Sequence, residues 1–124
     1  MPKDVVSWKQ QPVEKDFAAA SSFLSLIYPT TRTRSLVRAL RTARAVHHVA
    51  KDLLRASHLP LLPAEEEHVA EDLKRIRKGK PLSPVLLVRG DMSKGLPLVV
   101  ADGYHRICAI CYYDEDAPVA CRLV

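Results

Sequence analysis

The apolar residues of the N-terminal half recur at steps of three or four, which is the spacing of one helical face. A first run predicts a helix over residues 13–28, and Pro29 predicts its end because the residue before a proline disfavours helical backbone. The residues that would form its buried face are Phe17, Ala20, Leu24 and Ile27. Residues 1–12 show no periodicity, so we expect an irregular arm that Trp8 anchors to the body.

The same spacing predicts two further helices. One begins near Thr31 or Thr33, either of which can cap it, and runs through residue 50 and as far as Leu54. Its apolar face would hold Leu36, Leu40, Ala43, His47 and Ala50. The other covers residues 64–78, with glutamates at its start, basic residues at its end and Gly79 as a stop, an order that suits the helix dipole.

After Pro81 the pattern changes to short runs of apolar and β-branched residues. Residues 85–88, 96–101 and 119–124 are typical of strands, and residues 107–113 show a helical face. Strands separated by a single helix favour an α+β fold, in which N-terminal helices precede a small mixed β-sheet with helices. The length of 124 residues suits one compact domain, with residues 1–50 as an arm and helical extension and residues 51–124 as an α/β unit.

Composition narrows the classes of protein. No apolar run reaches the roughly 18–20 residues of a bilayer span, and no secretory signal follows Met1. The three cysteines are odd in number and fall within the last 17 residues, which argues against a disulfide framework. We therefore expect a cytoplasmic protein with no membrane partner.

The net charge of +5 is distributed unevenly along the chain. Residues 1–57 hold ten Lys and Arg against four Asp and Glu, whereas residues 58–124 hold nine against ten. A polyanionic partner would therefore be drawn to the first half of the chain.

The turn Asp102-Gly103-Tyr104-His105-Arg106 is the strongest candidate for chemistry. A strand that passes through a glycine directly into a helix leaves free N–H groups at the positive end of that helix, where phosphate binds. His105 and Arg106 add side-chain donors, and Asp102 would cap the helix, hold Arg106 or bind Mg²⁺. The alternative is an ordinary capped helix with two exposed basic residues.

Three segments around this turn carry a family resemblance. They are Asp52-Leu53-Leu54-Arg55, Pro84-Val85-Leu86-Leu87-Val88 and Ala101-Asp102-Gly103-Tyr104-His105-Arg106. In this order, and with the helix and strand that follow, residues 52–124 resemble the ParB/sulfiredoxin-like superfamily. The resemblance implies that superfamily's fold and a bound nucleotide, ATP or CTP with Mg²⁺, and it implies phosphotransfer or nucleotide hydrolysis.

The resemblance also implies roles for single residues. Gly103, the Tyr104 backbone, His105 and Arg106 would grip the phosphates, and Arg55 would reach the same pocket. His58 and His68 are further candidates for that pocket. Sulfiredoxins carry their reactive cysteine directly before the His-Arg pair, where this chain has Tyr104, so sulfinic-acid reductase activity is not expected.

A second interpretation places the function on the predicted second helix, without catalysis. Arg34, Arg38 and Arg41 fall on one stripe, with Arg44 alongside, and a DNA or RNA backbone or another partner could lie against them. A solvated helix face is the plainer alternative.

The spacing of His105, Cys108 and Cys111 is the last candidate, for a metal site. A structural zinc takes four ligands, and one short helix supplies too few, so the sequence predicts buried cysteines and no metal.

Overall fold

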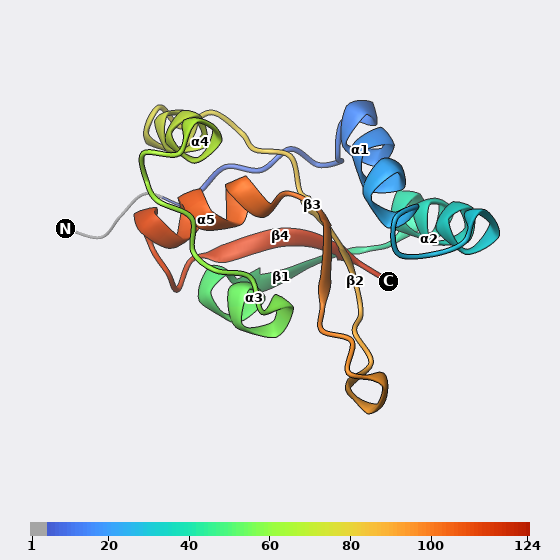
Figure 1. Cartoon of the computed structure of the whole chain (residues 1–124). Coiled ribbons are helices and arrows are strands. Elements are labelled where there is room, and N and C mark those ends of the chain that lie inside the picture. The colour runs from blue at the N-terminus through green and yellow to red at the C-terminus, as the bar shows by residue number, and fades with distance from the viewer. Residues whose placement is uncertain (1–4) are drawn as a thin grey trace.

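The computed structural model describes residues 5–124 and shows an α+β protein, which confirms the predicted class (Figure 1). The elements in chain order are α1 (Glu14–Leu24), α2 (Thr30–Thr42), β1 (Ala45–Val49), α3 (Ala50–Ser57), α4 (Glu67–Arg77), β2 (Val85–Val88), the 3₁₀ helix η1 (Met92–Lys94), β3 (Val99–Asp102), α5 (Tyr104–Tyr113) and β4 (Pro118–Leu123). No helix in this part of the chain has the length and apolar character that crossing a bilayer requires.

The four strands form one mixed sheet in the order β1-β4-β2-β3. The central strand β4 is antiparallel to β1 and parallel to β2, and Val85 lies opposite Cys121. β2 and β3 form an antiparallel hairpin in which Leu87 lies opposite Val100, with an irregularity between Leu86 and Leu87. The hairpin, with η1 at its tip, projects from the body of the protein (Figure 1).

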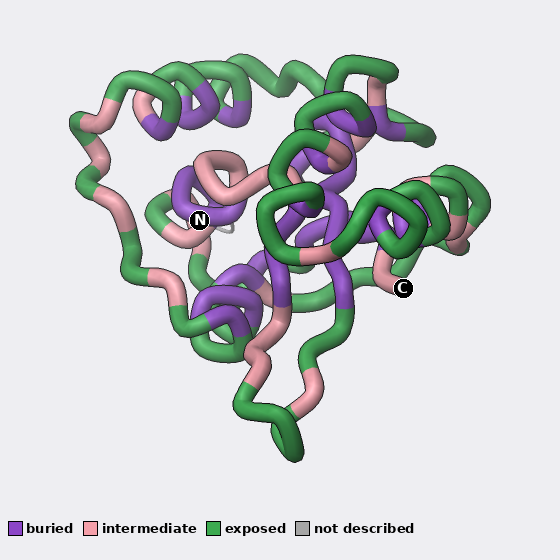
Figure 2. The backbone as a smooth tube through the Cα atoms, turned by 45° about the vertical axis from the view of Figure 1, so that its right-hand side comes forward, coloured by how far each residue is buried: buried purple, intermediate pink, exposed green. Residues whose placement is uncertain are grey.

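Helices cover both faces of this sheet, and β2 contributes to both cores. Val85 and Leu87 pack in a cluster with residues of α3, α4 and α5. Leu86 and Val88 pack in a second cluster with residues of α1 and α2. All four residues are buried, which explains why β2 is a continuous apolar run rather than an alternating one. Figure 2 shows the burial concentrated in the strands and on the inner sides of the helices.

The predicted helix from residue 31 as far as Leu54 is wrong in its second half. α2 ends at Thr42, and residues 45–49 form β1, which pairs along its length with β4. Arg122 of β4 supports the break, because its guanidinium donates to the carbonyls of Leu40 at 3.2 Å and Arg41 at 2.6 Å. These are carbonyls that a longer helix would have used for its own bonds.

The other predicted elements are found with shifts at their ends, but Ile27, expected on the buried face of the first helix, lies beyond α1 and is 43% exposed. The N-terminal arm is extended from residue 5 onward, and Trp8 bridges to Leu82 and packs against the core; residues 1–4 lie outside the described residues. The helix predicted from residue 64 begins at Glu67, because the Glu66 carboxylate caps it by accepting from the Val69 amide.

Candidate functional site

The turn between β3 and α5 has a backbone that glycine alone adopts easily. Gly103 is the N-cap of α5 and has φ of +111°. A Cβ at this position would lie 2.8 Å from Cβ of Val85 and closer still to its Cγ1. The chain therefore passes tightly over β2 as it turns into the helix, and this places the next residues at the edge of a cavity.

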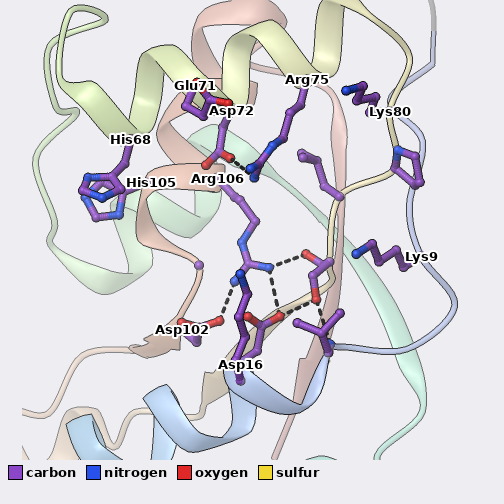
Figure 3. A pocket seen from close by; sticks show the side chains of 16 residues that line it. Lys9, Asp16, His68, Glu71, Asp72, Arg75, Lys80, Asp102, His105 and Arg106 are labelled. Atoms are coloured by element: carbon purple, nitrogen blue, oxygen red, sulfur yellow. Dashed lines mark hydrogen bonds and ion pairs between the residues drawn. The ribbon is translucent and has the colours of Figure 1, made fainter.

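Arg106 points away from solvent and into a buried polar network (Figure 3). Its Nη2 donates to Asp102 Oδ2 at 2.5 Å, and its Nη1 donates to the Ser83 carbonyl at 2.8 Å and lies 3.4 Å from Asp16 Oδ2. The Ser83 hydroxyl also donates to Asp16. With an exposed fraction of 12% and three acceptors, the guanidinium is fixed in place.

Asp102 was predicted to cap the helix, hold Arg106 or bind Mg²⁺, and the structure shows it holding Arg106. Burial raises the pKa of its carboxyl, while the guanidinium of Arg106 opposes that rise. The cation that neutralises this carboxylate is thus an arginine of the same chain. The arrangement at Asp102 does not favour a Mg²⁺ ion, since its Oδ2 already accepts from the Arg106 guanidinium.

His105 extends in a different direction, toward α4 (Figure 3). Its Nε2 lies 3.8 Å from Oε2 of Glu66, and its ring centroid lies 4.8 Å from that of His68. Nδ1 of His68 lies 3.1 Å from Oε1 of the same glutamate, and this hydrogen bond raises the pKa of His68. The histidine and the arginine of the motif therefore do not close over one point.

Both side chains nevertheless line the same cavity, of about 670 Å³. Its walls come from the N-terminal segment, the start of α1, α4, residues 80–83 and the start of α5. A volume of roughly 300–1,000 Å³ is typical of pockets that bind small molecules. The cavity is thus large enough for a nucleotide.

The charges on the cavity wall do not cancel completely. Five Lys and Arg and four Asp and Glu line it. Arg106 is shared by Asp16 and Asp102, and Nη1 of Arg75 lies 3.4 Å from Oδ1 of Asp72. The remaining charged residues are Lys9, Lys15, Lys80 and Glu71. None of these three lysines forms an ion pair within residues 5–124. The charged groups of the cavity wall that lack an ion-pair partner are therefore mostly positive.

Other residues of the predicted site lie elsewhere. The Tyr104 hydroxyl donates to the Pro60 carbonyl at 2.5 Å, and its side chain does not line the cavity. Arg55, on α3, lines a separate depression with Asp52, and its side chain is 82% exposed. His58 caps the C-terminus of α3 with φ of +59°. The structure therefore brings Gly103, His105, Arg106, Asp102 and His68 together, but neither Arg55 nor His58.

The basic stripe of the second interpretation is smaller than predicted. Arg34 and Arg38 are exposed on α2, but Arg41 pairs with Glu14 at 2.5 Å and lies 4.4 Å over the Phe17 ring. Arg44 follows the end of the helix, so it does not extend the stripe. Part of this charge thus joins α2 to α1.

Several residues of the site were not predicted from the sequence, among them Asp16, Ser83 and Glu66 and the three lysines of the cavity wall. Asp16 and Ser83 stand 90 and 23 positions from Arg106 in the chain, and only the packing of α1 against the sheet brings them together. No local motif marks either of them. Glu66 was expected only as one of the glutamates at the start of the predicted helix, and the structure shows that it is the N-cap of α4.

No family model, curated protein or solved structure matches this chain. The ParB/sulfiredoxin-like resemblance therefore stays a prediction based on motifs, and the structure itself shows the α+β class.

Proposed function

We propose that this chain binds a phosphate-bearing small molecule of nucleotide size in the cavity at the start of α5. The observation that carries the proposal is the wall of the cavity, where Lys9, Lys15 and Lys80 have no carboxylate partner among the described residues. Figure 3 shows Lys9 and Lys80 on the same side of the cavity. Ammonium groups without partners are ordinary ligands for phosphate oxygens.

The proposed roles differ from those that the motif suggested. Arg106 already faces two carboxylates, which outnumber its single positive charge, so an anion finds no free cation there. The phosphates would instead lie against Lys9 and Lys80, with Arg75 nearby on α4. The start of α5 adds a favourable dipole, because Gly103 has no side chain with which to cap it.

Thermal shift with single ligands tests this proposal. ATP, CTP, GTP and pyrophosphate are each added with and without Mg²⁺, at equal ionic strength. A ligand that binds only the folded chain stabilises it by about 2.7 kcal/mol at 100 times its Kd. We expect at least one of the four to raise the Tm of the protein, and the Mg²⁺ arm shows which form of the ligand is bound.

The double variant Lys9→Ala/Lys80→Ala should lose that rise. The matched control is Lys74→Ala/Lys94→Ala, which removes the same charge from exposed residues that do not line the cavity. Equal losses in the two double variants would mean that net charge, rather than this cavity, attracts the ligand. No shift with any of the four ligands at millimolar concentration would refute the proposal.

A further inference from the structure

Two histidines and a glutamate converge where the start of α4 meets the start of α5. Glu66 caps α4, His68 lies in its first turn, and His105 lies in the first turn of α5. One donor atom from each lies within 4.8 Å of the other two. We propose that Glu66, His68 and His105 bind a Zn²⁺ ion. This proposal does not depend on the proposed phosphate site.

The donor set fits zinc better than the hard cations. Zn²⁺ takes imidazole nitrogens and carboxylate oxygens, and sites with three protein ligands, two His and one Glu among them, leave a fourth position open. Mg²⁺ and Ca²⁺ prefer oxygen donors, of which this cluster has one carboxylate. The two imidazole nitrogens therefore favour a transition metal such as zinc over Mg²⁺ and Ca²⁺.

To hold one ion, the donor atoms, which now lie up to 4.8 Å apart, must close to the spacing of a zinc site. Ligand atoms about 2.0–2.1 Å from a tetrahedral zinc lie roughly 3.3 Å from one another. Oε1 of Glu66 and Nδ1 of His68 are already 3.1 Å apart, and Oε2 of Glu66 is 3.8 Å from Nε2 of His105. His68 and His105 are 67% and 44% exposed, so their rings are free to turn toward one ion.

The glutamate is held for this role by a bond outside the cluster. Its Oε2 accepts a hydrogen bond from the Val69 amide at 2.9 Å, which fixes the carboxylate at the start of α4. Partners of this kind orient metal ligands and tune their affinity. The helix cap thus keeps the carboxylate facing both imidazoles.

This cluster also differs from the metal site that the sequence excluded. Cys108 shares α5 with His105, but it is fully buried, and burial raises the pKa of its thiol. The partners of His105 come instead from the start of α4, some 40 positions earlier in the chain. The spacing of residues within α5 gives no sign of such distant partners.

Calorimetric titration of ZnCl₂ into untagged, EDTA-stripped protein tests the proposal. We expect the wild type to bind one Zn²⁺ per chain. His68→Ala and His105→Ala should each weaken the affinity by about tenfold or more, since loss of outer partners alone already costs 10–100-fold. The control His47→Ala/His48→Ala removes two exposed histidines of β1 and should bind as the wild type does.

Cobalt provides an independent readout. Co²⁺ added to the wild type should give the intense visible absorption of a four-coordinate site, and Glu66→Gln should reduce it. His68→Ala changes a largely exposed side chain, so it stays interpretable if His105→Ala fails to fold. Wild-type affinity in folded His68→Ala, or loss of binding in the β1 control, would overturn the proposal.

Discussion

Replacing Gly103 with alanine tests whether the tight turn into α5 is as constrained as the structure shows. The alanine must adopt the φ of +111° that Gly103 has. Its methyl group would also meet Val85, whose Cβ lies 2.8 Å from the new methyl position. Left-handed backbone costs about 1–2 kcal/mol for a residue with a side chain. Overpacking of a well-packed core costs about 1–3 kcal/mol more. We therefore expect a loss of about 2–5 kcal/mol in the free energy of unfolding.

Urea denaturation followed by far-UV circular dichroism measures this loss, which should also lower the Tm by roughly 10–20 °C. Gly79→Ala is the matched control, since Gly79 has φ of +71° and open space around its Cβ position. It should show the backbone cost alone, about 1–2 kcal/mol. The difference between the two variants isolates the contact with Val85.

A double-mutant cycle identifies the source of that difference. Val85→Ala removes Cγ1, the atom nearest to the new methyl, so Gly103→Ala/Val85→Ala should cost less than the sum of the single variants. A Gly103→Ala variant no less stable than Gly79→Ala would refute the reasoning, and so would strict additivity in the cycle.

Three other variants test further parts of the structure. Arg106→Met leaves the buried Asp16 carboxylate without its cation, so urea denaturation should show a loss of about 3–5 kcal/mol, and wild-type stability would contradict the network. Burial raises the pKa of the Cys121 thiol from its ordinary 9.0 to about 12, so stability should be intact below pH 9 and fall from pH 9 toward 12. Cys121→Ala should flatten that alkaline fall, measured by urea denaturation at each pH, and an unchanged profile would contradict it. Arg122→Met removes a charged donor from the end of α2 and should cost about 1.5–3 kcal/mol in the same assay, whereas a neutral effect would mean that the break after Thr42 does not need it.

The sequence predicted elements whose signals are local. The capped helix α4 and the apolar strand β2 were found at nearly their observed bounds, because caps and continuous apolar runs do not depend on distant residues. β1 was missed because the apolar spacing of α2 continues in phase through residue 50. Only pairing with β4, about 70 positions later in the chain, makes these residues a strand.

The site followed the same rule. The motif located Gly103 and the start of α5, where the local sequence dictates the turn. It did not show that Arg106 would be bound by Asp16, or that His105 would meet Glu66, since both contacts arise from helix packing across the sheet and between α4 and α5. Local sequence thus predicted the turn into α5, and tertiary packing determined the direction of each side chain around it.

The positions of α1 and α2 determine whether the protein can be truncated at residue 51. Residues 1–50 contain the edge strand β1 and the helices that cover Leu86 and Val88. They also contain Asp16, one of the two carboxylates that pair with Arg106. A fragment beginning at residue 51 would therefore expose one apolar face of the sheet to water, and Arg106 would keep only Asp102 as its carboxylate partner. The N-terminal fifty residues are a structural half of the protein, and a truncated version is expected to aggregate rather than fold.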